Sequence, residues 1–350
     1  MASPRWRPSA SIESLKARAA IIDRIRAFFR ARGLLEVETP ALSRAGVTDP
    51  HIDSFALQWN GPHAGRRYLH TSPEFPMKRL LAAGSGDIWQ IARVFRDGEA
   101  GRRHNPEFSL LEWYRLGWDH HRLMDEVEEL VRAVLPDLPT IRRLSYAEAF
   151  TTCGAPDPHD TDVDGWSDFI GRVGISLSGI GVPRTDRAGT DRAGTDQAGT
   201  DDAGDVGSEN GALDAAQCRD LVLTHWVEPR LPAACFIHAY PADQAALARI
   251  ADTRPPVAER FELYVAGVEL ANGFHELNDG TEQRARFEAE NRVRVRAGRP
   301  PVPLDEHLLA ALDAGLPACA GVALGVDRLV MLALGAQSLA DVLAFPMERA

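Results

Sequence analysis

The chain has 350 residues, of which 45% are hydrophobic and 25% charged, a composition typical of a globular protein with one large or two small domains. Its net charge of −11 argues against a protein that wraps nucleic acid by neutralising phosphates, but it does not exclude a local basic groove. The sequence has no signal-peptide core, no apolar stretch that would span a bilayer and no CxxC pair among its four cysteines. We therefore expect a cytoplasmic protein with reduced core thiols.

The first half of the chain mixes helices with strands. Apolar periodicity, capping residues and helix-ending residues mark these elements. In chain order they predict a helix from Ser11 to Gly33, a strand at 34–39, a short helix after Glu74, a strand at 89–95, a helix at 121–135 and a short helix from Ser145.

A polar repeat interrupts the middle of the chain. Residues 185–204 are four tandem pentapeptides, TDRAG, TDRAG, TDQAG and TDDAG. Such a segment buries too little apolar surface to offset the entropy of ordering it. We therefore expect a disordered, low-complexity insertion at 184–211 in a surface loop of a single domain that spans residues 1–350.

The second half continues the mixture of helices and strands. Its predicted elements are a helix at 215–226, a strand at 234–240, a helix at 244–250, strands at 261–265 and 268–271, a helix at 281–297, a strand at 320–325 and a helix at 327–334. The pair Ala266-Gly267 suits a tight hairpin turn between two of these strands. No glycine-rich phosphate loop follows a strand in a βαβ setting. These features predict an α+β fold with one antiparallel sheet flanked by helices.

The segment from Val94 to Tyr114 reads as a strand, a basic loop and a second strand. Alternation in the second strand places Phe108, Leu110, Glu112 and Tyr114 on one face. Arg96, at the end of the first strand, would therefore lie beside an aromatic ring and a carboxylate. That set suits a nucleotide together with an amine-bearing substrate. An ordinary amphipathic hairpin with a basic turn explains the same pattern equally well.

A second group of polar residues lies in the predicted hairpin at 261–271. With a turn at Ala266-Gly267, Tyr264 would pair with Glu269, and Glu262 with Ala271. Glu262 and Glu269 would then be diagonal neighbours, roughly 7 Å apart or less, on one face. Carboxylates at that separation suit Mg²⁺ that also contacts phosphate. The alternative is a pair of solvated glutamates on an exposed face.

A third segment, GVALGVDRLVMLALG at 321–335, combines a glycine-containing strand with the start of a helix. Glycines allow a ligand to approach the backbone closely. Arg328 would lie in the first turn of the helix, where its charge adds to the positive end of the helix dipole and favours phosphate. The alternative is a core strand with Arg328 in a structural ion pair.

Together these segments resemble the three signature motifs of class II aminoacyl-tRNA synthetases: GLLEVETPAL, FRDGE…RHNPEF and GVALGVDR. The runs TSPE, HNPEF, LLEWY and ELANGFHELND are similar to those of lysyl-tRNA synthetases. The first motif begins near residue 33, which leaves no room for the anticodon-binding barrel of those enzymes. The chain therefore resembles the elongation factor P lysine ligases, which are class II catalytic domains that join (R)-β-lysine to a lysine side chain of elongation factor P with ATP. The resemblance covers nearly the whole chain except the pentapeptides.

The resemblance implies an ATP and magnesium site. Arg96 and Arg328 would be the catalytic residues: Arg96 would hold the α-phosphate and the substrate carboxylate, and Arg328 the far end of ATP. Phe108 would stack on adenine, while Glu262 and Glu269 would bind Mg²⁺. The other residues implied at the nucleotide are Asp97, Gly98, His104, Asn105, Leu270 and Gly325.

The resemblance also implies a site for lysine or β-lysine. Glu276 and Tyr114 would meet the terminal ammonium, and Ser72, Glu74 and Glu112 would surround the second amine. Pro73, Asn272 and Ala323 complete this set. Ala323 stands where lysyl-tRNA synthetases have glycine, and its methyl group would favour β-lysine over α-lysine.

The implied activity is a ligase that acts on elongation factor P, works as a homodimer and does not use tRNA. One rival is a minimal lysyl-tRNA synthetase-like enzyme that charges tRNA, which the net charge and the missing anticodon module disfavour. The other is an inactive synthetase-like amino-acid sensor or scaffold. Gly98 supports that rival because the family usually has an acidic residue there, whereas this chain has Glu99 one position later.

Overall fold

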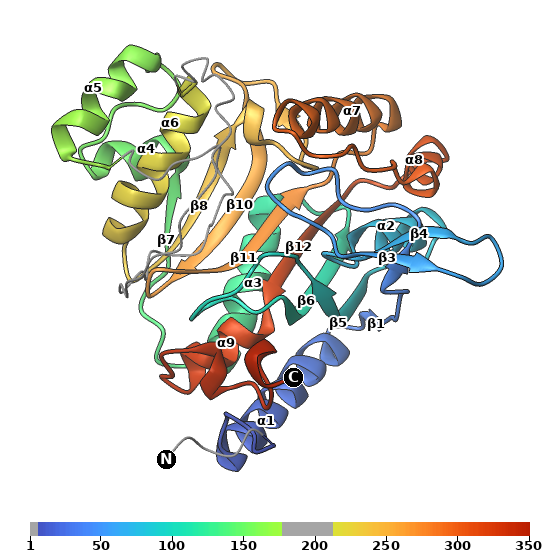
Figure 1. The fold of residues 1–350 in the computed structure, drawn as a ribbon. Helices are drawn as coiled ribbons and strands as arrows, with labels where there is room; N and C mark the ends of the chain where they lie inside the picture. The colour runs from blue at the N-terminus through green and yellow to red at the C-terminus, as the bar shows by residue number, and fades with distance from the viewer. Residues whose placement is uncertain (1–5, 177–212) are drawn as a thin grey trace, which may run out of the picture.

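A large mixed sheet runs through the molecule (Figure 1). The computed structural model describes residues 6–176 and 213–350, so the predicted insertion at 184–211 lies outside the described residues. Within these residues a nine-stranded sheet has the order β1-β5-β6-β12-β11-β10-β8-β7, with β9 paired to β10. The parallel pairs β1–β5 and β7–β8 lie at its ends, and the strands between them are antiparallel. The predicted α+β fold is confirmed, although the large sheet is mixed where one antiparallel sheet was expected.

A second sheet has three strands in the order β2-β4-β3. The strands of both sheets are β1 (Leu35–Glu36), β2 (Leu42–Ser43), β3 (Ala56–Trp59), β4 (Gly65–Leu69), β5 (Ile88–Phe95), β6 (Glu107–Leu116), β7 (Arg142–Ser145), β8 (Ala234–Pro241), β9 (Ile250–Ala251), β10 (Val257–Val265), β11 (Val268–His275) and β12 (Cys319–Gly325).

Helices surround the large sheet. They are α1 (Ile12–Ala31), α2 (Glu74–Ala82), α3 (His120–Val134), α4 (Tyr146–Thr152), α5 (Val163–Val173), α6 (Ala215–Val222), α7 (Gly280–Arg296), α8 (Glu306–Asp313) and α9 (Val326–Ala333). Short helical turns lie at Leu223–Val227, Glu228–Arg230, Ala242–Gln244, Leu339–Asp341 and Met347–Arg349. In the described residues no helix combines the length and apolar character needed to cross a membrane.

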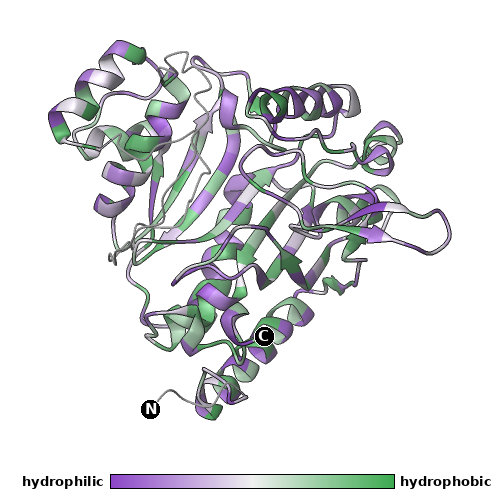
Figure 2. Ribbon diagram, in the orientation of Figure 1, coloured by the Kyte–Doolittle hydropathy of each residue, from purple (hydrophilic) through white to green (hydrophobic). Residues whose placement is uncertain are grey.

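The strands present different side chains to the two faces of the large sheet. Leu111 and Trp113 of β6, with Phe261 and Leu263 of β10, pack into the core beneath α1 and α3. Figure 2 shows hydrophobic segments along these strands, whereas α7 is mostly hydrophilic. The alternate residues of the same strands project from the opposite face, because successive side chains in a strand point to opposite sides. That opposite face carries the polar residues described below.

A buried ionic network fixes β6 against α3. Arg115 of β6 donates to Glu126 of α3, with Nη2 and Oε1 2.5 Å apart, and its Nη1 lies 2.8 Å from Asp87. The indole Nε1 of Trp113 donates to the same Glu126 at 3.1 Å. Glu126 thus has several donors although only 3% of its side chain is exposed. This pairing holds the strand that carries Glu112 and Tyr114 in a fixed position.

The predicted hairpin is confirmed, with one difference in register. Ala266 and Gly267 both adopt positive φ angles, and Tyr264 pairs with Glu269 as expected. The predicted pairing of Glu262 with Ala271 is wrong, because Glu262 pairs with Asn272. A β-bulge between Leu263 and Tyr264 causes the shift, since the facing strand carries one additional residue there.

Three other predicted elements differ from the structure. Residues 244–250 do not form the predicted helix: a short turn ends at Gln244 and β9 begins at Ile250. Ala246, between them, has a φ of 47°, which is incompatible with helix. The predicted helix at 215–226 leaves the α form after Val222, and the strand expected at 34–39 is reduced to β1. The four cysteines are free thiols, as expected.

We predict that Glu126→Ala destabilises the fold by about 3–5 kcal/mol, because it leaves the buried Arg115 guanidinium without its main partner. The measurement is the free energy of unfolding in urea. The control is Glu129→Ala on the same helix, where 59% of the side chain is exposed and the ion pair with Arg32 is worth about 1 kcal/mol or less. Equal effects of the two substitutions would contradict this account.

Candidate active site

A largely buried cluster of acidic side chains lies on the face of the sheet opposite α3. Strand pairing aligns Glu112 of β6 with Ala323 of β12, and Ala323 with Asn272 of β11. Tyr114 lies two pairs further along, opposite Gly321, and therefore on the same face as Glu112. Glu276, directly after β11, is 1% exposed. The residues that the sequence predicted for an amine site are thus brought together from three adjacent strands.

Helix α2 supplies the rest of this pocket. Glu74 lies in its first turn, and Lys78 lies one turn later with 1% of its side chain exposed. The Lys78 Nζ is 2.7 Å from Glu74 Oε1 and 2.6 Å from Glu276 Oε2. Tyr114 donates its hydroxyl to Glu112 at 2.6 Å. We call Glu74, Glu112, Glu276, Lys78 and Tyr114 the amine pocket.

The charges in the amine pocket are unbalanced. Burial, together with the Glu74 carboxylate, holds the pKa of Glu112 well above its usual range. Burial also raises the pKa of Glu276 to about 7, against the opposing effect of Lys78. Although burial disfavours its charge, the carboxylates of Glu276 and Glu74 raise the pKa of Lys78. One ammonium therefore faces three carboxyl groups, and the pocket has the electrostatics of a receptor for further ammonium groups.

Lys78 is the site residue that sequence reasoning missed. A lysine at i+4 from Glu74 is the ordinary signal for an exposed ion pair along a helix. The neighbouring Met77 and Leu81 are fully buried, which indicates that this face of α2 packs inward. The sequence thus shows the spacing of four residues between Glu74 and Lys78. The contact of Lys78 with Glu276 depends on the tertiary fold and cannot be read from that spacing.

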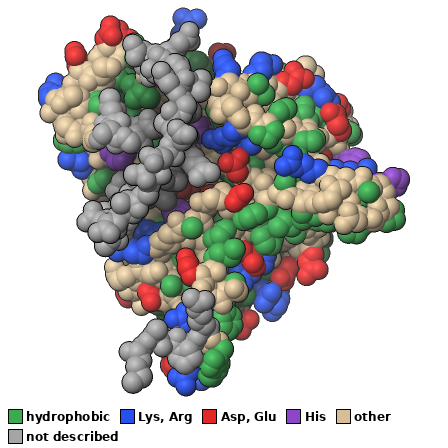
Figure 3. All heavy atoms as spheres, in the orientation of Figure 1, with side chains coloured by type: hydrophobic (Ala, Val, Ile, Leu, Met, Phe, Trp, Pro, Cys, Tyr) green, Lys and Arg blue, Asp and Glu red, His purple; other side chains and the backbone are tan. Residues whose placement is uncertain are grey.

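A basic cluster surrounds His104 at the start of α9. Arg328, in the first turn of α9, donates from Nη1 to the Glu269 backbone oxygen at 2.8 Å, and its Nη2 lies 2.5 Å from His104 Nε2. Burial and the charges of Arg328, Arg96 and Arg103 lower the pKa of His104 to about 3. His104 is therefore neutral, and the surrounding guanidiniums provide the charge that a polyphosphate needs. Figure 3 shows basic and acidic side chains close together near the middle of the face in view.

The turn after β5 shows how this chain accommodates Gly98 at a position where the family usually has an acidic residue. The Arg96 guanidinium lies 5.1 Å from the centre of the Phe108 ring and 3.5 Å from Glu99. Gly98 has a φ of 81°, a conformation that favours glycine. The turn at Gly98 thus allows the acidic residue one position later to reach Arg96. A cavity of about 670 Å³ adjoins this turn, lined in part by Asp97, Gly98 and Glu99.

The two predicted magnesium ligands lie on one face of the hairpin. Glu262 accepts hydrogen bonds from Arg260 and from Tyr264, whose hydroxyl is 2.7 Å away. Glu269 lies opposite Tyr264, with a carboxylate oxygen 3.8 Å from Arg328. An ionised carboxylate has about four acceptor positions, so it can accept hydrogen bonds and bind a cation at the same time. Carboxylate oxygens are the kind of ligand that Mg²⁺ prefers.

The remaining predicted residues are distributed as follows. Ser72 accepts a hydrogen bond from the Glu74 amide, and Pro73 precedes the first turn of α2. The Asn105 side chain bonds the backbone of Glu107 and Met347. Leu270 points into the core on the opposite face, so only its backbone can face a nucleotide. Gly325 precedes the first turn of α9. The backbone of Asp97 forms an isolated antiparallel β-bridge with that of Asp53.

Comparison with known proteins agrees with this geometry. The class II tRNA synthetase family (D, K and N) is matched over residues 5–349. The chain belongs to this family.

Curated relatives narrow the resemblance further. Proteins named elongation factor P–(R)-β-lysine ligase from Vibrio vulnificus and Yersinia enterocolitica are 47% and 48% identical to this chain. They align over 97% and 99% of it, and over 98% of their own lengths. The Vibrio cholerae protein of that name is 45% identical over both full lengths. The resemblance drawn from the sequence motifs is confirmed.

We predict that Gly321→Ala weakens the binding of lysine by about 10-fold or more, equivalent to about 1.4 kcal/mol. An added Cβ would overlap the Tyr114 ring and the Glu276 carboxylate, and both side chains are buried. The measurement is isothermal titration calorimetry with the full chain. Gly325→Ala on the same strand is the control, because its Cβ would meet Arg328 at 3.6 Å, an ordinary contact. Unchanged lysine affinity in the Gly321 variant would contradict the placement of the pocket.

Proposed function

We propose that the chain is an ATP-dependent ligase that activates (R)-β-lysine, or lysine, as an aminoacyl-adenylate. It then transfers the aminoacyl group to a lysine side chain of elongation factor P. The observation that carries the proposal is the amine pocket, in which one buried lysine ammonium lies among three carboxyl groups, and those of Glu112 and Glu276 are almost fully buried. The names of relatives aligned along their full lengths support it independently.

The charge of the pocket favours a diamino acid. Burial raises the pKa of Glu112 and of Glu276, and a substrate ammonium group beside either carboxyl group would lower that pKa again. With Glu74, Glu112 and Glu276 all ionised around the Lys78 ammonium, two negative charges remain, and two substrate ammonium groups would match them. One Glu112 carboxylate oxygen is buried without a hydrogen-bond donor, so a donor from the substrate has a place to bind. A substrate that lacks an ammonium would leave a desolvated carboxylate unpaired, which is a strong basis for rejecting it.

In the first step, an oxygen of the substrate carboxylate attacks the α-phosphorus of ATP, and the bond from that phosphorus to the bridging oxygen of pyrophosphate breaks. Arg96 would bind the α-phosphate and the carboxylate, bringing the reacting atoms together and stabilising charge in the transition state. Phe108 would stack on adenine, and Arg328 would bind the far phosphates. Glu262 and Glu269 would hold Mg²⁺, which would supply positive charge to neutralise the pyrophosphate.

In the second step, the neutral amine of the acceptor lysine attacks the carbonyl carbon of the adenylate, an amide bond forms and AMP leaves. The amine loses a proton in this step. The proposal includes a cytoplasmic homodimer, with the segment GLLEVETPAL at 33–42 at its interface as the first motif implies. It takes elongation factor P, and not tRNA, as acceptor, and the net charge of −11 is in keeping with that choice.

We expect the full chain with ATP and Mg²⁺ to exchange pyrophosphate into ATP when (R)-β-lysine or lysine is present, but not with norleucine, which lacks the terminal ammonium. Glu276→Gln should reduce exchange by about 100-fold, because a charge-assisted contact to the ammonium is lost. Glu107→Gln, on the exposed end of β6, should leave exchange unchanged. Mass spectrometry of elongation factor P then measures transfer. No adenylate with either isomer would contradict the proposal, and aminoacylated tRNA with unmodified elongation factor P would favour the tRNA-charging rival.

We further expect Ala323→Gly to shift the preference from β-lysine towards α-lysine. Ala323 lies between Glu112 and Asn272 in the strand register, so its methyl group borders the amine pocket. Removing the methyl group widens the pocket on the side of the second amine. The measurement is the ratio of kcat/KM for adenylation of the two isomers. An unchanged ratio would contradict a selective role for this methyl group.

A further inference from the structure

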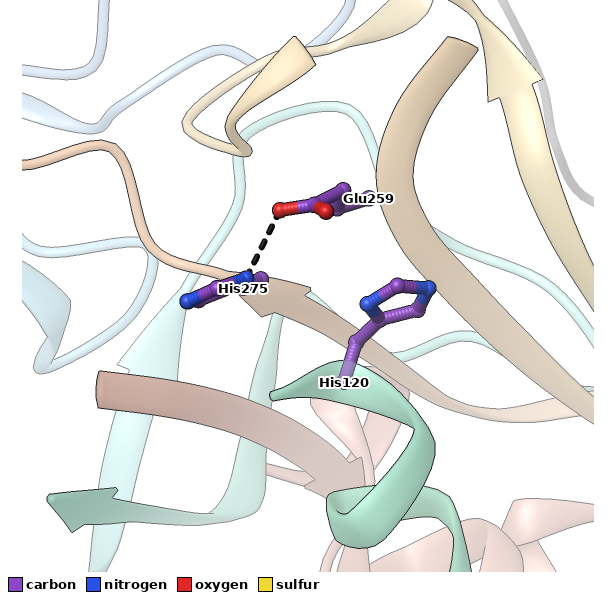
Figure 4. Close-up of side chains that lie close together, drawn as sticks. All are labelled: His120, Glu259 and His275. Atoms are coloured by element: carbon purple, nitrogen blue, oxygen red, sulfur yellow. Dashed lines mark ion pairs between the residues drawn. The ribbon is translucent and has the colours of Figure 1, made fainter. Parts of the chain in front are cut away.

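Three side chains of types that can ligate a metal ion converge on the face of the sheet opposite the amine pocket. They are His120 at the start of α3, Glu259 on β10 and His275 at the end of β11 (Figure 4). His275 pairs with Ala320, which belongs to the core beneath α3. The next residue, Glu276, faces the amine pocket. The two groups are therefore separated by the thickness of the sheet.

The geometry brings one ligand atom from each residue within 4.8 Å of the others. His275 Nδ1 is 2.7 Å from Glu259 Oε2. His120 is only 6% exposed, and its Nδ1 is buried without a hydrogen-bond partner. Figure 4 shows its ring extending from α3 towards the other two side chains. A buried polar atom without a partner costs about 1–3 kcal/mol, so this nitrogen requires an explanation.

We propose that His120, Glu259 and His275 form a site for a divalent transition-metal ion of the Zn²⁺ class, with water as a further ligand. Two imidazoles and one carboxylate are a ligand set that zinc uses, whereas Mg²⁺ prefers oxygen ligands. Bonds of about 2.0–2.1 Å place tetrahedral ligand atoms roughly 3.3 Å apart, so the side chains need only close inward around the ion. The bound ion would join the start of α3 to the β10–β11 hairpin. This site is independent of the proposed ligase activity.

The Arg249 guanidinium lies beside two of the proposed ligands and would compete with a metal ion for them. Its Nη1 lies 3.4 Å from His275 Nε2, and its Nε lies 4.0 Å from Glu259 Oε2. The Arg249 side chain is 46% exposed, so it can move into solvent when an ion arrives. Binding through His275 Nδ1 transfers the ring proton to Nε2, which then donates a hydrogen bond to water. The alternative is a metal-free ion-pair network of Arg249, Glu259 and His275.

The test uses the full chain without a histidine tag, stripped with a chelator and titrated with Co²⁺ in the presence of excess Mg²⁺. We expect one Co²⁺ per chain with visible d–d absorption, displaced by one equivalent of Zn²⁺. Zinc should also raise the Tm, because it binds the folded state. His120→Asn should lower affinity by more than the roughly 10–100-fold that loss of an outer-shell partner costs, and should remove the zinc effect on the Tm.

His121→Asn is the matched control. Its ring lies 4.1 Å from that of His120 on the same helix, but it contributes no ligand atom to the cluster. This variant should bind Co²⁺ like the parent chain. Circular dichroism shows whether each variant folds, and Glu259→Gln provides a second ligand variant if His120→Asn does not. Absence of the absorption, or equal affinity in the parent chain and every variant, would overturn the proposal.

Discussion

The active face of the molecule depends on the burial of carboxyl groups around one internal ammonium. Lys78 is almost wholly buried, and it contacts Glu74 on its own helix and Glu276 beyond β11. An unpaired charge at either position would be strongly destabilising in such surroundings. The ion pairs therefore fix α2 against the sheet. The three carboxyl groups outnumber the single ammonium of Lys78. The arrangement that stabilises the fold therefore also favours the binding of a cationic ligand.

The two faces of the sheet divide the work between stability and chemistry. On one face, Leu111 and Trp113 pack beneath α1 and α3, and Arg115 is paired with Glu126. On the other face, Glu112 and Tyr114 of the same strand line the amine pocket. Because the residues alternate, any movement of β6 would disturb both faces. A rigid, fully paired core thus positions side chains that must meet a small substrate precisely in space.

The sequence predicted the parts of the site that depend on local pattern. Alternation identified Phe108, Glu112 and Tyr114, and the Ala266-Gly267 turn correctly paired Tyr264 with Glu269. The bulge, the positive φ of Ala246 and the inward position of Lys78 depend on tertiary packing, which no local pattern records. Family resemblance supplied roles for Leu270 and Asn105, whose side chains the structure assigns to the core and to backbone contacts.

The bulge in the β10–β11 hairpin has a consequence for how this strand can evolve. Glu269 and Asn272 are three positions apart, so a regular strand would point them in opposite directions. The additional residue of the bulge, Leu270, shifts the alternation of side chains by one position. Glu269, Asn272 and Glu276 therefore all lie on one face of the sheet. The residues proposed for the nucleotide and for the amine thus lie within β11 and directly after it. Deletion of Leu270, the additional residue, would turn Glu269 away from the face that carries Asn272 and Glu276, so the length of β11 is constrained as well as its side chains.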